Sequence, residues 1–214
     1  MKRCLIITGG KLDLSFAGSF LEQETFDKII AVDAGLEAVK ALGLEPVVGD
    51  FDTVKPGILQ YYRQKEHIIW DTHQPEKDET DTELALLKAQ AMGCTHIVIL
   101  GATGGRMDHM LGNIHLLFPC LQKGIEACIL DCQNRIYLID GERTFRSSGL
   151  WGRYISFLPL TEHVDGITLT GFKYPLLDKD IEIGTSLCIS NELIGEEGTI
   201  TFTDGVLIVV ESHD

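Results

Sequence analysis

The chain has 214 residues, of which 44% are hydrophobic and 23% are charged. This length suffices for one large or two small hydrophobic cores, and the composition excludes intrinsic disorder and a collagen-like repeat. The 32 Asp and Glu residues outnumber the 18 Lys and Arg residues and give a formal net charge of −14. The chain lacks the basic surface that nucleic-acid binding requires, so we expect no nucleic-acid partner.

Residues 1 to about 132 alternate between short apolar runs and helix-like segments. The predicted strands are mostly β-branched and lack apolar-polar alternation, which is typical of buried parallel strands. They are residues 3–8, 28–32, 46–48, 67–69, 96–100 and 127–131. The predicted helices are residues 36–42, 56–65, 82–92 and 108–121. Thr80 and Glu83 form a capping box at the start of the third helix, and the alternation predicts βαβ units.

From about residue 133 the predicted elements are short strands separated by turns. They are residues 135–140, 152–158, 166–170, 186–190, 198–202 and 206–211. Asp204 and Gly205 separate the last two strands, and this dipeptide predicts a β-hairpin turn. We therefore expect an α/β fold with two domains: an N-terminal open, mostly parallel α/β sheet domain of residues 1–132 and a smaller C-terminal all-β, sandwich-like domain of residues 133–214.

The negative charge is concentrated near the C-terminus. Residues 151–214 hold 11 acidic and 3 basic residues, a net charge of −8, whereas residues 1–150 hold 21 and 15, a net charge of −6. No stretch approaches the roughly 20 apolar residues of a membrane helix, and the apolar run at residues 4–7 is too short for a signal peptide. Five of the six cysteines lie in apolar segments, as packed thiols do. We expect a cytoplasmic protein with no membrane partner.

Glycines and carboxylates follow several of the predicted strands. Open α/β sheets bind ligands beyond the carboxyl ends of their strands, so these positions are the first candidates for a site. They are Gly9-Gly10, Asp33-Ala34-Gly35, residues 49–52 and residues 101–108. The polar loop at residues 77–81 adds further acids, including Asp78. We expect these loops to meet at one edge of the sheet.

Such an edge has the groups needed for phosphoryl transfer. Asp50, Asp52 and Asp81 supply the hard oxygen ligands that Mg²⁺ prefers. The glycine-rich loop at residues 101–105, which includes Gly104 and Gly105, lets backbone N–H groups approach a phosphate at a helix start, and Arg106 adds a planar cation. Together these groups favour metal-assisted phosphoryl-type transfer.

Each of these motifs also has a purely structural interpretation. Two aspartates separated by one residue commonly form a turn, and Asp78 and Asp81 could simply occupy a first helical turn. The glycine-rich loop lacks the Lys-Ser/Thr of a Walker A motif. His109 and His115 are six residues apart and do not share a helix face, so we interpret both as structural or solvent-facing, while Asn113 could point inward. The convergence of four loops favours the functional interpretation.

Three motifs, in this order and spacing, resemble the thiamine pyrophosphokinase family. They are residues 49–53 (GDFDT), residues 77–83 (KDETDTE) and residues 101–109 (GATGGRMDH) followed by Asn113. The resemblance covers the whole chain and includes Ser190 and Asn191 in the predicted β domain. It implies transfer of an intact pyrophosphoryl group from ATP to the hydroxyethyl oxygen of thiamine, with Mg²⁺ required, which gives thiamine diphosphate and AMP.

The resemblance also implies roles for individual residues. Asp50, Asp52 and Asp81 would hold Mg²⁺ and the triphosphate, and Thr80, Arg106 and Asp108 would line the nucleotide and transfer site. The other expected binding residues are Asp33, Asp78, Gly104, Gly105, Asn113, Ser190 and Asn191. The family forms homodimers, so Ser190 and Asn191 would contact thiamine from across the subunit interface, with Asp33 near the thiamine end of the cleft. Lys77 stands where some relatives carry a neutral amide.

Two other functions use the same residues. A metal-dependent nucleotide phosphohydrolase would transfer the group to water, and a non-catalytic thiamine or nucleotide sensor would only bind. In the transfer reaction, positioning and Mg²⁺ would dominate, and Asp81 or Asp108 would at most assist late proton removal. The sequence leaves open which aromatic side chain packs on thiamine, and Trp70 and Trp151 are both better explained as core residues.

Overall fold

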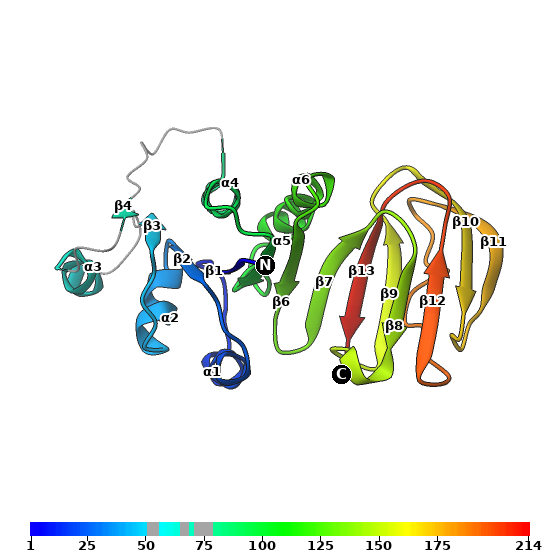
Figure 1. The fold of residues 1–214 in the computed structure, drawn as a ribbon, viewed down its shortest axis with the longest axis horizontal. Coiled ribbons are helices and arrows are strands. Elements are labelled where there is room, and N and C mark those ends of the chain that lie inside the picture. Colours follow the sequence, from blue (N-terminus) through cyan, green and yellow to red (C-terminus); the bar gives the residue numbers. More distant parts are fainter. Residues whose placement is uncertain (51–55, 65–68, 71–78) are drawn as a thin grey trace. The chain divides into compact units, whose positions relative to one another are not determined.

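The computed structural model describes residues 1–50, 56–64, 69–70 and 79–214. The chain divides into two compact units, Met1–Cys132 and Gln133–Asp214. The first unit contains helices and parallel strand pairs, and the second contains antiparallel strands (Figure 1). The chain is therefore a mixed α/β protein, with parallel pairing in one unit and antiparallel pairing in the other. Within the described residues, no helix is long and apolar enough to span a membrane.

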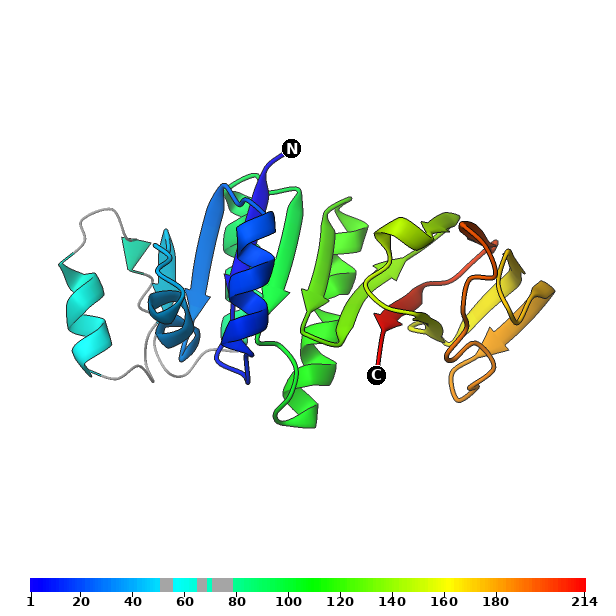
Figure 2. The same ribbon diagram turned by 90° about the horizontal axis from the view of Figure 1, so that it is seen from below.

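The first unit is built on a sheet with the strand order β4-β3-β2-β1-β5-β6, in which every pair is parallel. The strands are β1 (Arg3–Ile7), β2 (Lys28–Val32), β3 (Val48–Asp50), β4 (Ile69–Trp70), β5 (His96–Leu100) and β6 (Glu126–Leu130). Residues 4–7 of β1 are completely buried, because helices cover both faces of the sheet. Helices α1 and α2 lie on one face, and α4 and α6 lie on the other (Figures 1 and 2).

The helices of this unit are α1 (Leu14–Gln23), α2 (Gly35–Ala41), α3 (Pro56–Arg63), α4 (Asp81–Ala91), α5 (Met107–His115) and α6 (Leu117–Gln122). The predicted cap of α4 is confirmed, because the Thr80 hydroxyl accepts a hydrogen bond from the Glu83 backbone N–H at 3.3 Å. Sequence reasoning missed α1. Its signal is Asp13, whose carboxylate accepts hydrogen bonds from the backbone N–H groups of Ser15 and Phe16 at 2.9 and 3.0 Å.

The single helix predicted for residues 108–121 is wrong. Two helices, α5 and α6, meet at Leu116, which caps the first and begins the second. Pro119 explains the break, because it has no N–H to donate to the carbonyl of His115 and its ring crowds that carbonyl. The break ends α5 early and keeps it as a short helix that begins directly after the glycine-rich loop.

The strands of the second unit pair antiparallel, in the orders β7-β13-β9, which belong to the same nine-stranded mixed sheet as β1 to β6, and β11-β10-β12-β8, which form a separate sheet. The strands are β7 (Asn134–Ile139), β8 (Arg143–Arg146), β9 (Tyr154–Pro159), β10 (His163–Thr170), β11 (Leu176–Glu182), β12 (Glu197–Thr201) and β13 (Leu207–Ser212). One buried cluster contains side chains from both sheets. Phe145, Phe157 and Phe172 lie at its centre, in edge-to-face pairs with ring centroids 5.6 to 5.9 Å apart.

Two predictions for this unit are wrong. Asp204 and Gly205 do not close a hairpin, because β12 and β13 belong to different sheets. Gly205 has a φ of 100° and carries the chain from one sheet to the other, and the same turn chemistry serves either connection. The strand predicted for residues 186–190 is a series of turns that ends at Ser190, whose φ is 55°. The exposed, charged β11 was missed because it contains no apolar run.

Candidate active site

The loops that follow β1, β2 and β5 approach one another at the carboxyl edge of the parallel sheet (Figure 2). A Cβ atom at Gly10 would overlap the carbonyl oxygen of Gly101, and one at Gly35 would overlap the carbonyl oxygen of Ile7. Gly101 has a φ of 73°, and a Cβ atom there would lie 2.7 Å from the Thr8 carbonyl oxygen. Only glycine permits these backbone approaches, so the glycines bring the three loops together.

Acidic residues lie at this edge on neighbouring elements. Asp33 directly follows β2 and adopts a left-handed conformation with a φ of 49°, which is costly for a residue other than glycine. Val32 is paired with Asp50, the last residue of β3, so the ends of these two strands are adjacent. Asp81 opens α4, and a helix that follows a strand in a βαβ unit begins at the carboxyl edge.

The structure covers the predicted metal ligands only in part. For Asp50 it describes the backbone, and Asp52 and Asp78 lie outside the described residues. Within the described residues, no group of three or more His, Cys, Asp or Glu side chains is arranged to hold a metal ion. The metal roles of Asp50, Asp52 and Asp81 therefore stay predictions.

Arg106 and Asp108 form an exposed ion pair where α5 begins. The guanidinium Nε donates to Oδ1 of Asp108 at 3.1 Å, and Nη2 donates to Oδ2 at 2.5 Å. This pairing lowers the pKa of Asp108 to about 2, and the backbone N–H of His109 also stabilises the carboxylate. The side chains of Arg106 and Asp108 are 72% and 61% exposed, so an incoming anion can reach the guanidinium.

Two side chains hold the glycine-rich loop in place. Asn113 on α5 donates its amide N–H to the carbonyl oxygen of Ala102 at 3.1 Å, and the Thr103 hydroxyl donates to Asp131 at 2.7 Å. Asn113 supports the loop through this bond, and its predicted contact with a ligand stays a prediction. Lys11 was not among the predicted site residues, although it lies next to the glycine-rich loop. Its Cβ atom is 3.5 Å from the position that a Cβ atom added at Gly104 would occupy. The available signal was the position of Lys11 directly after Gly9-Gly10.

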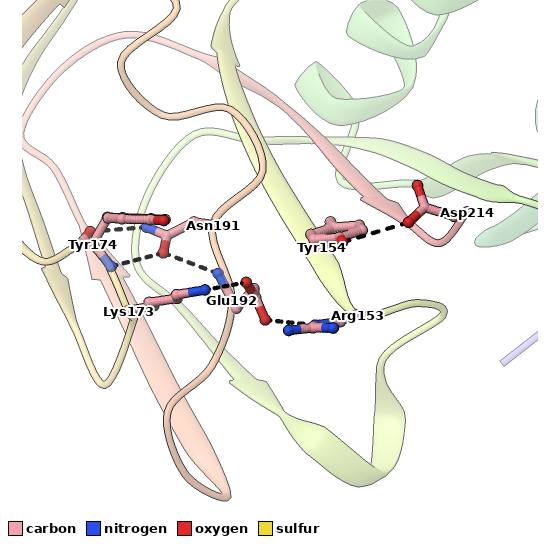
Figure 3. Close-up of polar contacts among 7 residues, drawn as sticks. All are labelled: Arg153, Tyr154, Lys173, Tyr174, Asn191, Glu192 and Asp214. Atoms are coloured by element: carbon pink, nitrogen blue, oxygen red, sulfur yellow. Dashed lines mark hydrogen bonds and ion pairs between the residues drawn. The ribbon is translucent and has the colours of Figure 1, made fainter.

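In the second unit, Ser190 and Asn191 differ in what they can contact. The Ser190 side chain is exposed, and its backbone N–H donates to the hydroxyl of Ser156 at 2.9 Å. Asn191 is only 2% exposed, and its Oδ1 accepts hydrogen bonds from the backbone N–H groups of Tyr174 and Glu192 at 3.0 and 2.9 Å. Its Nδ2 donates to the Tyr174 carbonyl oxygen at 2.9 Å (Figure 3). The Ser190 side chain therefore faces solvent, whereas the Asn191 amide holds the backbone of the half-exposed Tyr174, and the predicted thiamine contacts of both residues stay predictions.

A parallel α/β sheet whose loops meet at its carboxyl edge defines the class of open α/β proteins, in which ligands bind at that edge. Residues 21–129 match the family model described as thiamin pyrophosphokinase, catalytic domain, and residues 139–207 match the thiamin pyrophosphokinase, vitamin B1 binding domain. The chain is 40% identical to the thiamine pyrophosphokinase of Bacillus subtilis, and the match spans all of both chains. The chain belongs to the thiamine pyrophosphokinase family.

Solved structures agree with this assignment. The crystal structure of the Bacillus subtilis thiamine pyrophosphokinase has a TM-score of 0.88 at 36% identity, with 100% of both chains covered. That of the Geobacillus thermodenitrificans thiamin pyrophosphokinase has a TM-score of 0.85 at 32% identity, covering 99% of this chain and 98% of the other. The resemblance drawn from the three sequence motifs is confirmed.

Proposed function

We propose that this protein transfers the pyrophosphoryl group of ATP to thiamine and releases thiamine diphosphate and AMP. The observation that carries the proposal is the match to a thiamine pyrophosphokinase over the full length of both chains, with separate catalytic and vitamin-binding models matched in the two units. The convergence of three glycine-bearing loops beside Arg106 supports a phosphate-binding site in the first unit.

The transfer forms one bond and breaks one. The hydroxyl oxygen of thiamine attacks the β-phosphorus of ATP, the bond from that phosphorus to the bridging oxygen of AMP breaks, and the hydroxyl proton is lost. Arg106 binds the phosphates and gives up its pairing with Asp108. Because that pairing is the main reason for the low pKa of Asp108, its loss raises the pKa towards the ordinary value and lets the carboxylate accept a proton late in the reaction.

The acidic residues at the sheet edge are of the chemical type that binds a magnesium ion. Asp50 ends β3 and Asp81 begins α4, and carboxylate oxygens are the ligands that Mg²⁺ prefers. We propose that Asp50, Asp52 and Asp81 hold this ion, with Asp78 and Thr80 next to them. When bound, Mg²⁺ neutralises charge on the triphosphate oxygens.

We assign ATP binding and catalysis to residues 1–132 and thiamine binding and dimerisation to residues 133–214. Gly104 and Gly105 are exposed on the loop before α5, and their backbone N–H groups would bind phosphate. Ser190 and Asp33 would lie at the thiamine end, with Asp33 supplied by one subunit and Ser190 by the other. The buried thiols of Cys4, Cys94, Cys120 and Cys188 fit a reducing cytoplasmic location.

One assay separates the proposed reaction from its alternatives. The protein is incubated with ATP, Mg²⁺ and thiamine, and the nucleotide and thiamine products are separated. AMP with thiamine diphosphate is expected. ADP with thiamine monophosphate would indicate an ordinary kinase, consumption of ATP without thiamine a phosphohydrolase, and binding without turnover a sensor.

A Ser190→Ala variant is expected to raise the KM for thiamine by about three- to tenfold, which corresponds to the loss of one hydrogen bond. The KM for ATP should stay unchanged, because Ser190 lies in the second unit. Steady-state kinetics with each substrate varied in turn measure the effect. Ser186→Ala removes another exposed hydroxyl from the same series of turns and should leave both constants unchanged. Equal changes in both KM values for Ser190→Ala would contradict the assignment.

Exposed apolar side chains in the second unit support a homodimer. Six large ones lie between residues 174 and 194, with exposures from 46% to 83%: Tyr174, Leu177, Ile183, Leu187, Ile189 and Ile194. We propose that these side chains form one apolar patch, because contiguous exposed apolar patches are typical of interaction surfaces.

We expect a Leu177→Lys/Ile194→Lys variant to shift the protein from dimer to monomer, since two charges would be buried without partners in the interface. Size-exclusion chromatography with light scattering measures the mass. The matched control is Leu87→Lys, which changes a 44% exposed leucine on α4 in the first unit and should leave the mass unchanged. A dimeric double variant would refute this surface as the interface.

A further inference from the structure

Glu192 bridges two basic side chains directly after Ser190 and Asn191. Its Oε2 accepts a hydrogen bond from Nε of Arg153 at 2.6 Å, and its Oε1 accepts one from Nζ of Lys173 at 2.7 Å (Figure 3). The Glu192 side chain is 14% exposed, whereas those of Arg153 and Lys173 are 67% and 47% exposed. One carboxylate is therefore shared by two cations, and the three charges sum to +1.

The backbone around Glu192 is held independently of these ion pairs. The Glu192 carbonyl accepts from the Lys173 N–H at 2.8 Å, and the Glu192 N–H donates to the side chain of Asn191. Asn191 is in turn paired with Ile155 through two backbone hydrogen bonds of 2.8 and 3.0 Å. The backbone at residues 191–192 should therefore keep its conformation when the Glu192 charge is removed. A substitution can then change the charge without changing the shape of the loop.

The two cations are unusual for this part of the chain. Residues 151–214 contain only three Lys or Arg residues against eleven acids, and Arg153 and Lys173 are two of the three. Thiamine carries a permanent positive charge on its thiazolium ring. Arg153 and Lys173 pair with Glu192, two residues after Ser190, and without that carboxylate their full charge would repel a cation bound at this loop.

We propose that Glu192 is a specificity-determining positioning residue, which lowers the charge of the Arg153 and Lys173 pair from +2 to +1 so that the adjoining loop accepts a cationic substrate. The inference rests on the proposed thiamine pyrophosphokinase function and deepens it. Glu192 acts through the two basic side chains and does not itself contact the reacting atoms. The hydrogen bonds from Lys173 and Arg153 also lower the pKa of Glu192, which keeps the carboxylate charged at neutral pH.

The test is Glu192→Gln, which keeps the side-chain shape and removes the charge. The KM for thiamine should rise about fivefold, an effect expected for an uncompensated charge near the substrate, while the KM for ATP stays unchanged. The KM for an uncharged thiamine isostere, with a thiophene ring in place of the thiazolium, should also stay unchanged. Raising the ionic strength should reduce the defect with thiamine, since salt screens the repulsion.

A triple variant separates the charge role from a structural one. Arg153→Gln/Lys173→Met/Glu192→Gln removes all three charges and both ion pairs, and we expect it to restore the KM for thiamine to within about twofold of the wild-type value. The matched control is Glu197→Gln, which removes an exposed carboxylate paired with Arg146 at 2.7 Å and should leave all constants unchanged. A defect in Glu192→Gln that is equal for thiamine and its isostere, or that persists in the triple variant, would overturn the proposal.

Calorimetric titration with thiamine keeps this test distinct from that of the proposed function. If the wild-type protein binds thiamine but forms no thiamine diphosphate, the proposed reaction fails, and the weaker binding expected for Glu192→Gln is still measured. If the wild-type protein produces thiamine diphosphate and Glu192→Gln binds thiamine as tightly as the wild type, the proposed role of Glu192 is refuted and the proposed reaction stands.

Discussion

Replacing Asp81 with asparagine is expected to reduce the formation of thiamine diphosphate by at least about a hundredfold, in line with the loss of a charged group that acts on the transferring phosphates. Asp81 is the first residue of α4, at the edge where the loops of the first unit meet. Asparagine keeps the shape of the side chain, and the Thr80 cap remains. The folded protein should therefore lose about 1 kcal/mol or less, from the weaker interaction with the helix dipole.

The measurements are product formation at saturating ATP and thiamine, and the melting temperature. Activity should recover in part at higher Mg²⁺ concentration if Asp81 is a metal ligand. The matched control is Glu83→Gln, which removes the same charge from the same helical turn and should retain near-normal turnover. A nearly active Asp81→Asn variant would remove Asp81 from the proposed site.

The Gly10→Ala variant is expected to lose stability and activity together. The added Cβ would overlap the carbonyl oxygen of Gly101, so one of the two loops must shift. A forced backbone movement of this kind costs about 2–3 kcal/mol, which corresponds to a melting temperature lower by about 5–10 °C for a chain of this size. The KM for ATP should rise as well, because Gly10 packs against Gly101, which lies on the same loop as the proposed phosphate-binding residues Gly104 and Gly105.

Thermal unfolding and the ATP dependence of turnover test this expectation. Gly112→Ala provides the control, because Gly112 lies inside α5 and a Cβ there would meet nothing within 4 Å. Alanine should stabilise that helix by about 0.5–1 kcal/mol. A Gly10→Ala variant with wild-type stability and ATP affinity would mean that the loops of β1 and β5 do not depend on their close approach.

Sequence patterns predicted the buried elements of the first unit well. β2 and β5 have the expected bounds, and β1 ends one residue earlier than expected. Completely buried strands leave a continuous apolar signal, because both of their faces are covered. β11 leaves no such signal, since it is an exposed strand at the edge of its sheet, and it was missed.

For the candidate site, too, sequence patterns predicted some features and missed others. Residue type and spacing identified the family, because its three short motifs occur in this chain in the same order and at the same intervals. They did not predict which of these residues also support the backbone. Asn191 was expected at the substrate, and the structure buries it with its amide bonded to the backbone of Tyr174. Asn113 likewise supports the loop at Ala102.

The sequence by itself determined the family, the alternation of helices and strands in the first unit, and the residue types of the candidate site, because these depend on local periodicity and on short motifs. Only the tertiary structure decided that Asp204-Gly205 joins two sheets, that Gly10 lies against Gly101, and that Glu192 pairs with both Arg153 and Lys173. The positions of Gly10 and Glu192 depend on contacts between residues far apart in the chain. The Asp204-Gly205 turn could join strands of one sheet or of two sheets, because the same turn residues serve both connections. Their energies depend on distance and burial, which no local pattern encodes.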